Sequence, residues 1–241
     1  MVQSPFYPGD GACHVYVLHP PGGLVGGDDL ALSIDVAPHA HALLTTPAAS
    51  KLYRCDGRSA RQRQRITVAA AGACEWLPQE TLAFTGADAR IETAVDLAAA
   101  ARFLGWEHGC LGRPANGEAF TRGRLVQSLE VRVEGSPRLL ERQRLEGGAP
   151  ALAAPWGLDG RAAGATVVLY PASESLLALA RRLVDGLDEC RAGASVVDGL
   201  LVCRALAAHI RPLRGLLRRL WEGLRPALLG CRPVPPRIWA T

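Results

Sequence analysis

Carboxylates are the residues of this sequence with the clearest potential for chemistry. Glu141 lies in "RLLERQRL", a stretch whose alternation is typical of a β-strand. The alternation places Glu141 on one face with Leu139 and Leu145, and puts Arg142 and Arg144 on the other. A charged carboxylate on an apolar face is costly unless it is paired, hydrated or coordinated. Two interpretations follow: a buried ion pair with an arginine, or the lining of an internal polar passage.

Glu107, in "LGWEHGCLGRP", and Asp28, in "PPGGLVGGDD", are similar candidates. The glycines before Asp28 raise the question of a phosphate-binding loop. Neither the P-loop pattern nor the dinucleotide fingerprint fits, and the next element is a predicted strand rather than a helix that could meet a phosphate. We therefore predict that these glycines allow positive φ and close backbone packing in a tight strand connection, and that the chain binds no nucleotide.

Histidines and cysteines give no complete site. His39 and His41, spaced i, i+2, would share a strand face but supply only half of a metal site, so a solvated pair in a turn is expected. Cys13 and His14 are adjacent in a predicted strand and point to opposite faces. The seven cysteines are odd in number and form no C-x-x-C pair, which predicts a reduced, cytoplasmic protein rather than a disulfide or zinc framework.

Composition narrows the class of protein. Of 241 residues, 49% are hydrophobic and 21% charged, with a net charge of +4, as in ordinary globular domains. Lys51 is the only lysine, and the arginines are spread along the chain, so nucleic acid is not an expected partner. No run of about eighteen apolar residues is present, so no membrane span is expected. The opening "MVQSPFYPGDGAC" does not resemble a secretory signal.

The first 146 residues predict strands. Apolar residues alternate with polar ones over 30–36, 90–97 and 125–133, which is the pattern of half-buried strands. A repeat of near thirty residues relates "VAPHAHALL", "VAAAGACEWL" and "LAAAARFLGW", in which Val36, Val68 and Leu97 correspond. Each block ends one strand, turns through small residues and starts another. The repeat predicts a β-solenoid or layered sheets.

Helical patterns begin only after residue 170. Residues 173–187 predict a helix with Ser173 as N-cap, a strand is predicted over 194–206, and residues 212–224 predict a second helix with one leucine stripe. A Gly- and Pro-rich stretch at 146–164 links the two regions. We expect a single, mostly-β domain over 1–241 with two C-terminal α-helices.

Six blocks in order resemble the urease accessory protein UreD family, called UreH in some bacteria. They are "HVYVLHPPGGLVGGD", "ALLTTPAASKLYR", "EWLPQETLAF", "LGWEHGCLGRPANGEAF", "LLERQRL" and "RPVPPRIWAT", and the resemblance runs from about residue 4 to the last residue. It implies a β-helix-like stack with two helices near the C-terminus. Members of the family usually begin with several more strands, so this chain looks N-terminally short. Either its start is misplaced or the strands are missing, and missing strands would leave a sheet edge unpaired.

The resemblance further implies a non-enzymatic chaperone of metallocentre assembly. Such proteins bind a UreF-like partner, which recruits a UreG-like GTPase, and the complex docks on apo-urease and helps insert nickel. An internal tunnel is thought to carry transient Ni²⁺, with no tightly bound cofactor. By resemblance, Asp28, Ser50, Glu107 and Glu141 match polar positions associated with that passage.

Two other hypotheses remain open at this point. One is a carbohydrate-active enzyme on a β-solenoid, with Glu75 and Glu80 as paired acid and base. Few aromatic residues are available for sugar stacking, since Trp, Tyr and Phe total 5%. The other is a structural scaffold whose polar interior is incidental.

Overall fold

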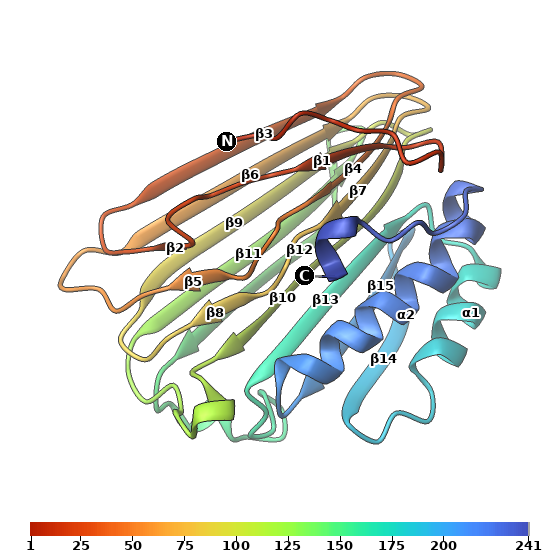
Figure 1. Cartoon of the computed structure of the whole chain (residues 1–241). Coiled ribbons are helices and arrows are strands. Elements are labelled where there is room, and N and C mark those ends of the chain that lie inside the picture. Colours follow the sequence, from red (N-terminus) through yellow and green to blue (C-terminus); the bar gives the residue numbers. More distant parts are fainter. Residues whose placement is uncertain (241) are drawn as a thin grey trace.

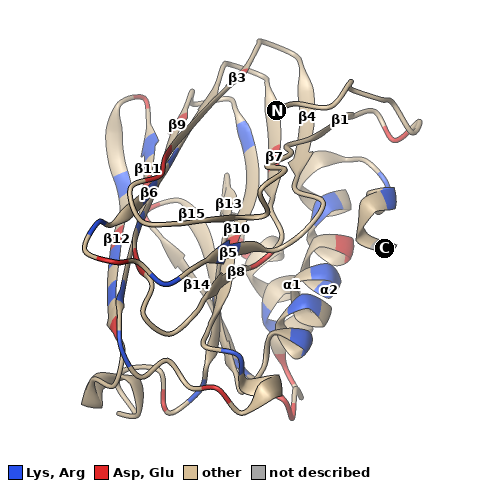
Figure 2. Ribbon diagram, turned by 60° about the vertical axis from the view of Figure 1, so that its left-hand side comes forward, with Lys and Arg blue, Asp and Glu red and all other residues tan. Residues whose placement is uncertain are grey.

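The structure, a computed structural model, describes residues 1–240 and has three layers (Figures 1 and 2). A five-stranded sheet faces a ten-stranded sheet, and two α-helices cover the outer face of the larger sheet. The strands are β1 (Cys13–Tyr16), β2 (Gly23–Leu24), β3 (Asp29–Val36), β4 (His41–Thr45), β5 (Ser50–Leu52), β6 (Ala60–Val68), β7 (Ala73–Leu77), β8 (Thr81–Ala83), β9 (Asp88–Leu97), β10 (Arg102–Leu111), β11 (Arg124–Val133), β12 (Ser136–Glu146), β13 (Ala163–Tyr170), β14 (Cys190–Val197) and β15 (Leu200–Ala207). The helices are α1 (Glu174–Val184) and α2 (Ile210–Leu229), with 3-10 turns at Pro114–Asn116, Pro150–Leu152 and Arg237–Ala240.

The chain winds in coils that stack strand upon strand. Strands β3, β6, β9 and β11 pair in parallel in the smaller sheet, and β1, β4, β7 and β10 do so in the larger one. Val36 lies opposite Val68, and Val68 opposite Leu97, so the repeat seen in the sequence is the register of the stack. The mostly-β, solenoid-like prediction is confirmed.

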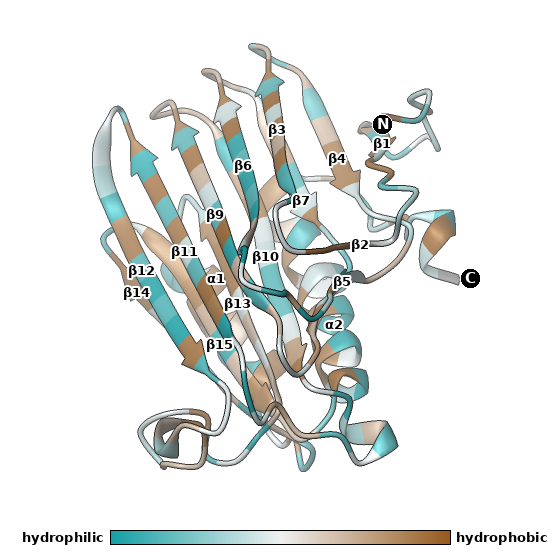
Figure 3. Ribbon diagram, turned by 90° about the vertical axis from the view of Figure 1, so that its left-hand side faces the viewer, coloured by the Kyte–Doolittle hydropathy of each residue, from teal (hydrophilic) through white to brown (hydrophobic). Residues whose placement is uncertain are grey.

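Alternating side chains hold the two sheets together. Along β6, Arg61, Arg63 and Arg65 are exposed, whereas Ile66 and Val68 face the opposite sheet and are buried. Figure 3 shows the same alternation of hydrophobic and hydrophilic bands along the strands of the smaller sheet. Apolar side chains from both sheets fill the space between them. Burial of this alternating set is what fixes the pairing register, because a slip of one residue would turn the arginines inward.

The helices form where capping and periodicity predict them. The Ser173 hydroxyl accepts a hydrogen bond from the Leu176 N–H at 3.2 Å, which confirms the N-cap. Helix α2 is longer than the predicted 212–224, and ends where Gly230 adopts a left-handed φ of 71°. Its leucine stripe is buried against the larger sheet, together with Val167 and Ala205. None of the helices formed by residues 1–240 is long and apolar enough to cross a membrane.

Of two local predictions, the glycine-rich strand connection is confirmed and the single strand over 194–206 is wrong. The glycine block does connect strands: Gly27 has a φ of 95°, and a Cβ on Gly23 would lie 2.4 Å from the Lys51 carbonyl oxygen. The predicted single strand over 194–206 is wrong, because β14 and β15 form a hairpin that turns at Asp198 and Gly199, both with positive φ.

The predicted histidine pair does not form either. His39 lies in the turn before β4 with a φ of 61° and is exposed, while His41 is the first residue of the strand. The His41 imidazole contacts Glu75 at 2.8 Å, so the two histidines share neither a face nor a solvated turn.

Candidate functional site

Two facing rows of mostly polar residues lie in the space between the sheets. On the larger sheet, Glu107 of β10 lies opposite Thr166 of β13, which lies opposite Arg204 of β15. On the smaller sheet, the register aligns Gln64, Thr93, Leu129 and Glu141 across β6, β9, β11 and β12. Because side chains at one register level of facing sheets point at one another, the two rows meet across the interior.

Glu107 is the most perturbed carboxyl of this interior. The Thr93 hydroxyl donates a hydrogen bond to it, and the same hydroxyl lies 3.2 Å from the Gln64 amide oxygen. Burial raises the pKa of Glu107 to about 7, the charge of Glu141 adds to the rise, and the Thr93 hydrogen bond opposes it. A carboxyl with this pKa exchanges its proton near neutral pH.

Glu141 joins the two sheets through an ion pair. Its Oε2 accepts from the Arg204 Nη2 at 2.6 Å and from Nε at 3.2 Å, while its Oε1 accepts from Thr166 at 3.3 Å and from Gln143 at 2.8 Å. The Glu141 side chain is 17% exposed and that of Arg204 is 49% exposed. Glu141 is therefore paired with an arginine that stays half exposed, and it also lines a cavity.

Two cavities occupy the space between the sheets. The larger, of about 760 Å³, extends from Glu107 and Glu141 toward Trp156 and Arg191; the smaller, of about 240 Å³, extends from Glu107 toward Ser50 and the N-terminal residues. They share four lining residues: Thr81, Glu107, His108 and Gln127. Glu107 therefore lies where the two cavities adjoin.

The four candidate residues are not all brought together. Glu107 and Glu141 both line the larger cavity, and Ser50 lines the smaller one. Asp28 lines neither; its Oδ2 accepts from the Val25 N–H at 2.9 Å and closes the glycine-rich turn before β3. Asp28 thus has a local structural role that its place in the sequence block did not reveal.

Four further polar residues belong to this interior and were not predicted from the sequence: Arg204, Thr93, Thr166 and Gln64. Gln64 carried a usable signal, because it shares a strand face with Ile66 and Val68, as Glu141 does with Leu139. Arg204 carried no such signal in the sequence, since its partner Glu141 lies 63 residues away.

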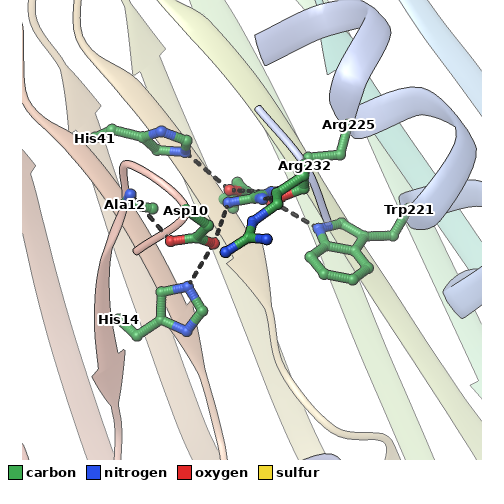
Figure 4. A network of polar contacts seen from close by, with 8 residues as sticks. Asp10, Ala12, His14, His41, Trp221, Arg225 and Arg232 are labelled. Carbon is green, nitrogen blue, oxygen red and sulfur yellow. Dashed lines mark hydrogen bonds and ion pairs between the residues drawn. The ribbon is translucent and has the colours of Figure 1, made fainter. Parts of the chain in front are cut away.

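A second polar cluster is buried beneath α2 (Figure 4). The fully buried Arg225 donates to Glu75 at 2.9 and 3.0 Å and to Asp10 at 2.8 Å. His14 contacts Asp10 at 3.0 Å, and the Trp221 indole donates to Glu75 at 2.7 Å. Burial alone would raise the pKa of Asp10, but the hydrogen bond from His14 and the charge of Arg225 lower it. The cluster ties the N-terminal segment and β7 to the last helix.

Glu80 is held in the same manner nearby. The side chain is 1% exposed, and Arg214 donates to it at 2.9 Å through Nε and again through Nη2. Burial would raise the pKa of Glu80, but His108 and Arg214 lower it to about 2. Glu75 and Glu80 are therefore enclosed and paired with cations, and neither lines the two cavities. They are not placed to act as acid and base on a sugar.

Comparisons with known proteins agree along the whole chain. The sequence model of the family described as "UreD urease accessory protein" matches residues 1–240. A protein of Pseudomonas putida strain W619 named "Urease accessory protein UreD" is 46% identical over 241 residues, covering 100% of this chain and 85% of the relative. Proteins of the same name from Klebsiella pneumoniae and Klebsiella aerogenes are each 45% identical over 242 residues, covering 100% of this chain and 85% and 87% of the relatives. The chain belongs to the UreD urease accessory protein family.

Proposed function

We propose that this chain is a non-enzymatic maturation factor. It binds UreF-like and UreG-like partners, docks with them on apo-urease, and helps deliver Ni²⁺ to the urease active site. Family membership supports a role in urease maturation. We propose further that nickel passes through the interior of this chain.

The observation that carries the proposal is the position of Glu107 between two cavities. A cation that crossed the interior from the Ser50 side to the Glu141 side would pass this carboxyl. A route through the protein requires groups that bind the ion at several points without retaining it. The facing rows of carboxyl, hydroxyl and amide groups supply oxygen ligands along such a route.

The chemistry of the lining suits transfer. Carboxylate oxygens bind Ni²⁺ less tightly than imidazole or thiolate does. Ni²⁺ competes with a proton for Glu107, because only the ionised carboxylate is a good ligand and its pKa lies at about 7. Glu141 is paired with Arg204, and a passing cation would compete with that guanidinium.

Co-expression tests the proposal directly. The chain is produced with UreF-like, UreG-like and urease subunits, complexes are separated by size exclusion, and nickel per purified urease is measured by mass spectrometry. We expect nickel content to fall when the chain is omitted. We also expect it to fall with Glu107→Gln while the complex still assembles.

A surface variant provides the matched control. Glu118 is a partly exposed glutamate in an ion pair with Arg113, outside the cavities. Glu118→Gln should leave nickel loading unchanged. Full loading of urease without the chain would refute the maturation role, and full loading with Glu107→Gln would refute the passage.

A further inference from the structure

The outward face of α2 carries a concentration of arginines. Arg211, Arg214, Arg218 and Arg219 are all exposed within the first ten residues of the helix. The buried leucine stripe of the same helix faces the larger sheet, so these guanidinium groups lie on the opposite side and along its flank. Figure 2 shows blue segments recurring along α2.

Gly215 lies at the centre of this arginine group. On a helix, Arg211, Arg218 and Arg219 are its neighbours at i−4, i+3 and i+4. Gly215 is two residues, or roughly 200°, beyond the buried Leu213, and so points directly outward. Nothing lies within 4 Å of the position that its Cβ would take.

The fold does not require a glycine at this position. A second glycine of the helix, Gly223, is explained by packing, since a Cβ there would meet Leu183 of α1 at 2.7 Å. Gly215 has no such neighbour and no left-handed φ, yet glycine within a helix is less favourable than alanine. A glycine at an open, outward position leaves the helix backbone accessible for close approach by another molecule.

The charges of this face are incompletely neutralised within the chain. Arg218 pairs with Glu222, and Arg214 reaches down to Glu80. Arg211 and Arg219 have no carboxylate partner anywhere in the part of the chain that the structure describes. Along β6, by contrast, Arg61, Arg63 and Arg65 each pair with a carboxylate.

We propose that the face of α2 around Gly215 docks an acidic segment of a partner protein, with its carboxylates on Arg211 and Arg219 and its backbone against the glycine. Guanidinium groups bind carboxylates through paired hydrogen bonds, and a flat contact at glycine permits the close packing of a protein interface. The choice of probes rests on the proposed function: the UreF-like protein and apo-urease, each purified alone.

Two variants and one control test this surface. Arg211→Glu with Arg219→Glu reverses the unpaired charges, and Gly215→Leu places a side chain on the open position. The control is Arg142→Glu, because Arg142 of β12 is also exposed and lacks a carboxylate partner among residues 1–240. Binding of each probe is measured by biolayer interferometry, and thermal unfolding is recorded for every variant.

We expect one probe to bind about tenfold or more weakly to the charge-reversed variant and to Gly215→Leu, with the control unchanged. Gly215→Leu should unfold at the same or a higher temperature, because leucine favours a helix more than glycine does. Weaker binding by a more stable variant excludes a folding defect as the cause. Raising NaCl from about 50 mM to about 500 mM should weaken wild-type binding more than binding of the charge-reversed variant.

Unchanged binding of both probes to the variants would overturn the docking surface while leaving the proposed function intact. The surface is also overturned if the variants lose binding only to phosphatidylserine vesicles or to RNA. If the wild-type chain binds neither probe, the proposed function is refuted. The proposed docking of an acidic partner segment on this surface is then refuted as well.

Discussion

The Arg204 guanidinium lies 2.6 Å from the Glu141 carboxylate and so links β15, the strand next to the edge of the larger sheet, to β12, the edge strand of the smaller one. The pair closes the row that begins at Glu107 and continues through Thr166. It is half open to solvent on the arginine side. The pair therefore restrains the wall of the larger cavity without being sealed inside the protein.

Glu141→Gln tests this link. Because Arg204 remains in contact with water, we expect a loss of about 1 kcal/mol or less in the free energy of unfolding, rather than the larger cost of breaking a buried pair. The variant should fold and assemble with its partners, yet urease matured with it should contain less nickel. Urea unfolding and metal analysis measure the two effects. Loss of assembly would indicate a purely structural pair, and full loading would make Glu141 a bystander.

Arg225→Met should destabilise the fold far more. The substitution leaves Glu75 and Asp10 buried without their common cation, which costs about 3–5 kcal/mol in comparable sites. Arg61→Met is the control, because Arg61 and Glu92 are both partly exposed and such pairs contribute about 1 kcal/mol or less. The free energy of unfolding is measured by chemical unfolding. Equal losses in the two variants would show that the buried cluster stabilises the fold no more than a surface ion pair does.

Glu107 should make the stability of the protein depend on pH. The folded pKa, about 7, lies above the ordinary value of 4.5, so the folded state holds the proton more tightly between these values. The free energy of unfolding should therefore fall as pH rises through this window, and stay level above it. Glu107→Gln should reduce the difference in stability between about pH 5 and about pH 8, measured by urea unfolding. An unchanged pH dependence would contradict the raised pKa.

Leu217→Asp should yield insoluble protein. Leu217 is 3% exposed and packs between α2 and the larger sheet, so the new carboxylate would be buried in an apolar core. Ala227→Asp on the exposed side of the same helix is the control and should remain soluble. Soluble expression of both variants, with unfolding temperatures close to that of the wild type, would show that α2 packs more loosely than the structure indicates.

The stacked strands were predictable because buried residues recur at the same position in each successive coil of the chain. Val36, Val68 and Leu97 occupy one register position in three successive coils, and each is buried, so the same residue class recurs at the same spacing. The Ser173 cap was predictable because its hydrogen bond is local. The β14–β15 hairpin was missed although "DG", a strong signal for a two-residue turn, stands at Asp198 and Gly199.

Candidate site residues were predictable only in part. Glu141 was found because a carboxylate broke an apolar alternation, but its partner Arg204 comes from a strand whose relation to β12 is set by the whole fold. Arg225 resembles the surface arginines of the same helix in the sequence. Only the position of Glu75 and Asp10 beneath α2 distinguishes it.

The buried cluster around Arg225 has a consequence for synthesis on the ribosome. Glu75 leaves the ribosome 150 residues before the arginine that neutralises it, and Asp10 leaves it 215 residues before. At about 5–20 residues per second, the first coils wait roughly ten seconds or longer for their counter-charge. Until then His14 and His41 are the only basic partners of these carboxylates among residues 1–240, so burying them costs more before Arg225 is synthesised than after. We therefore expect this part of the fold to reach its full stability only when translation is nearly finished.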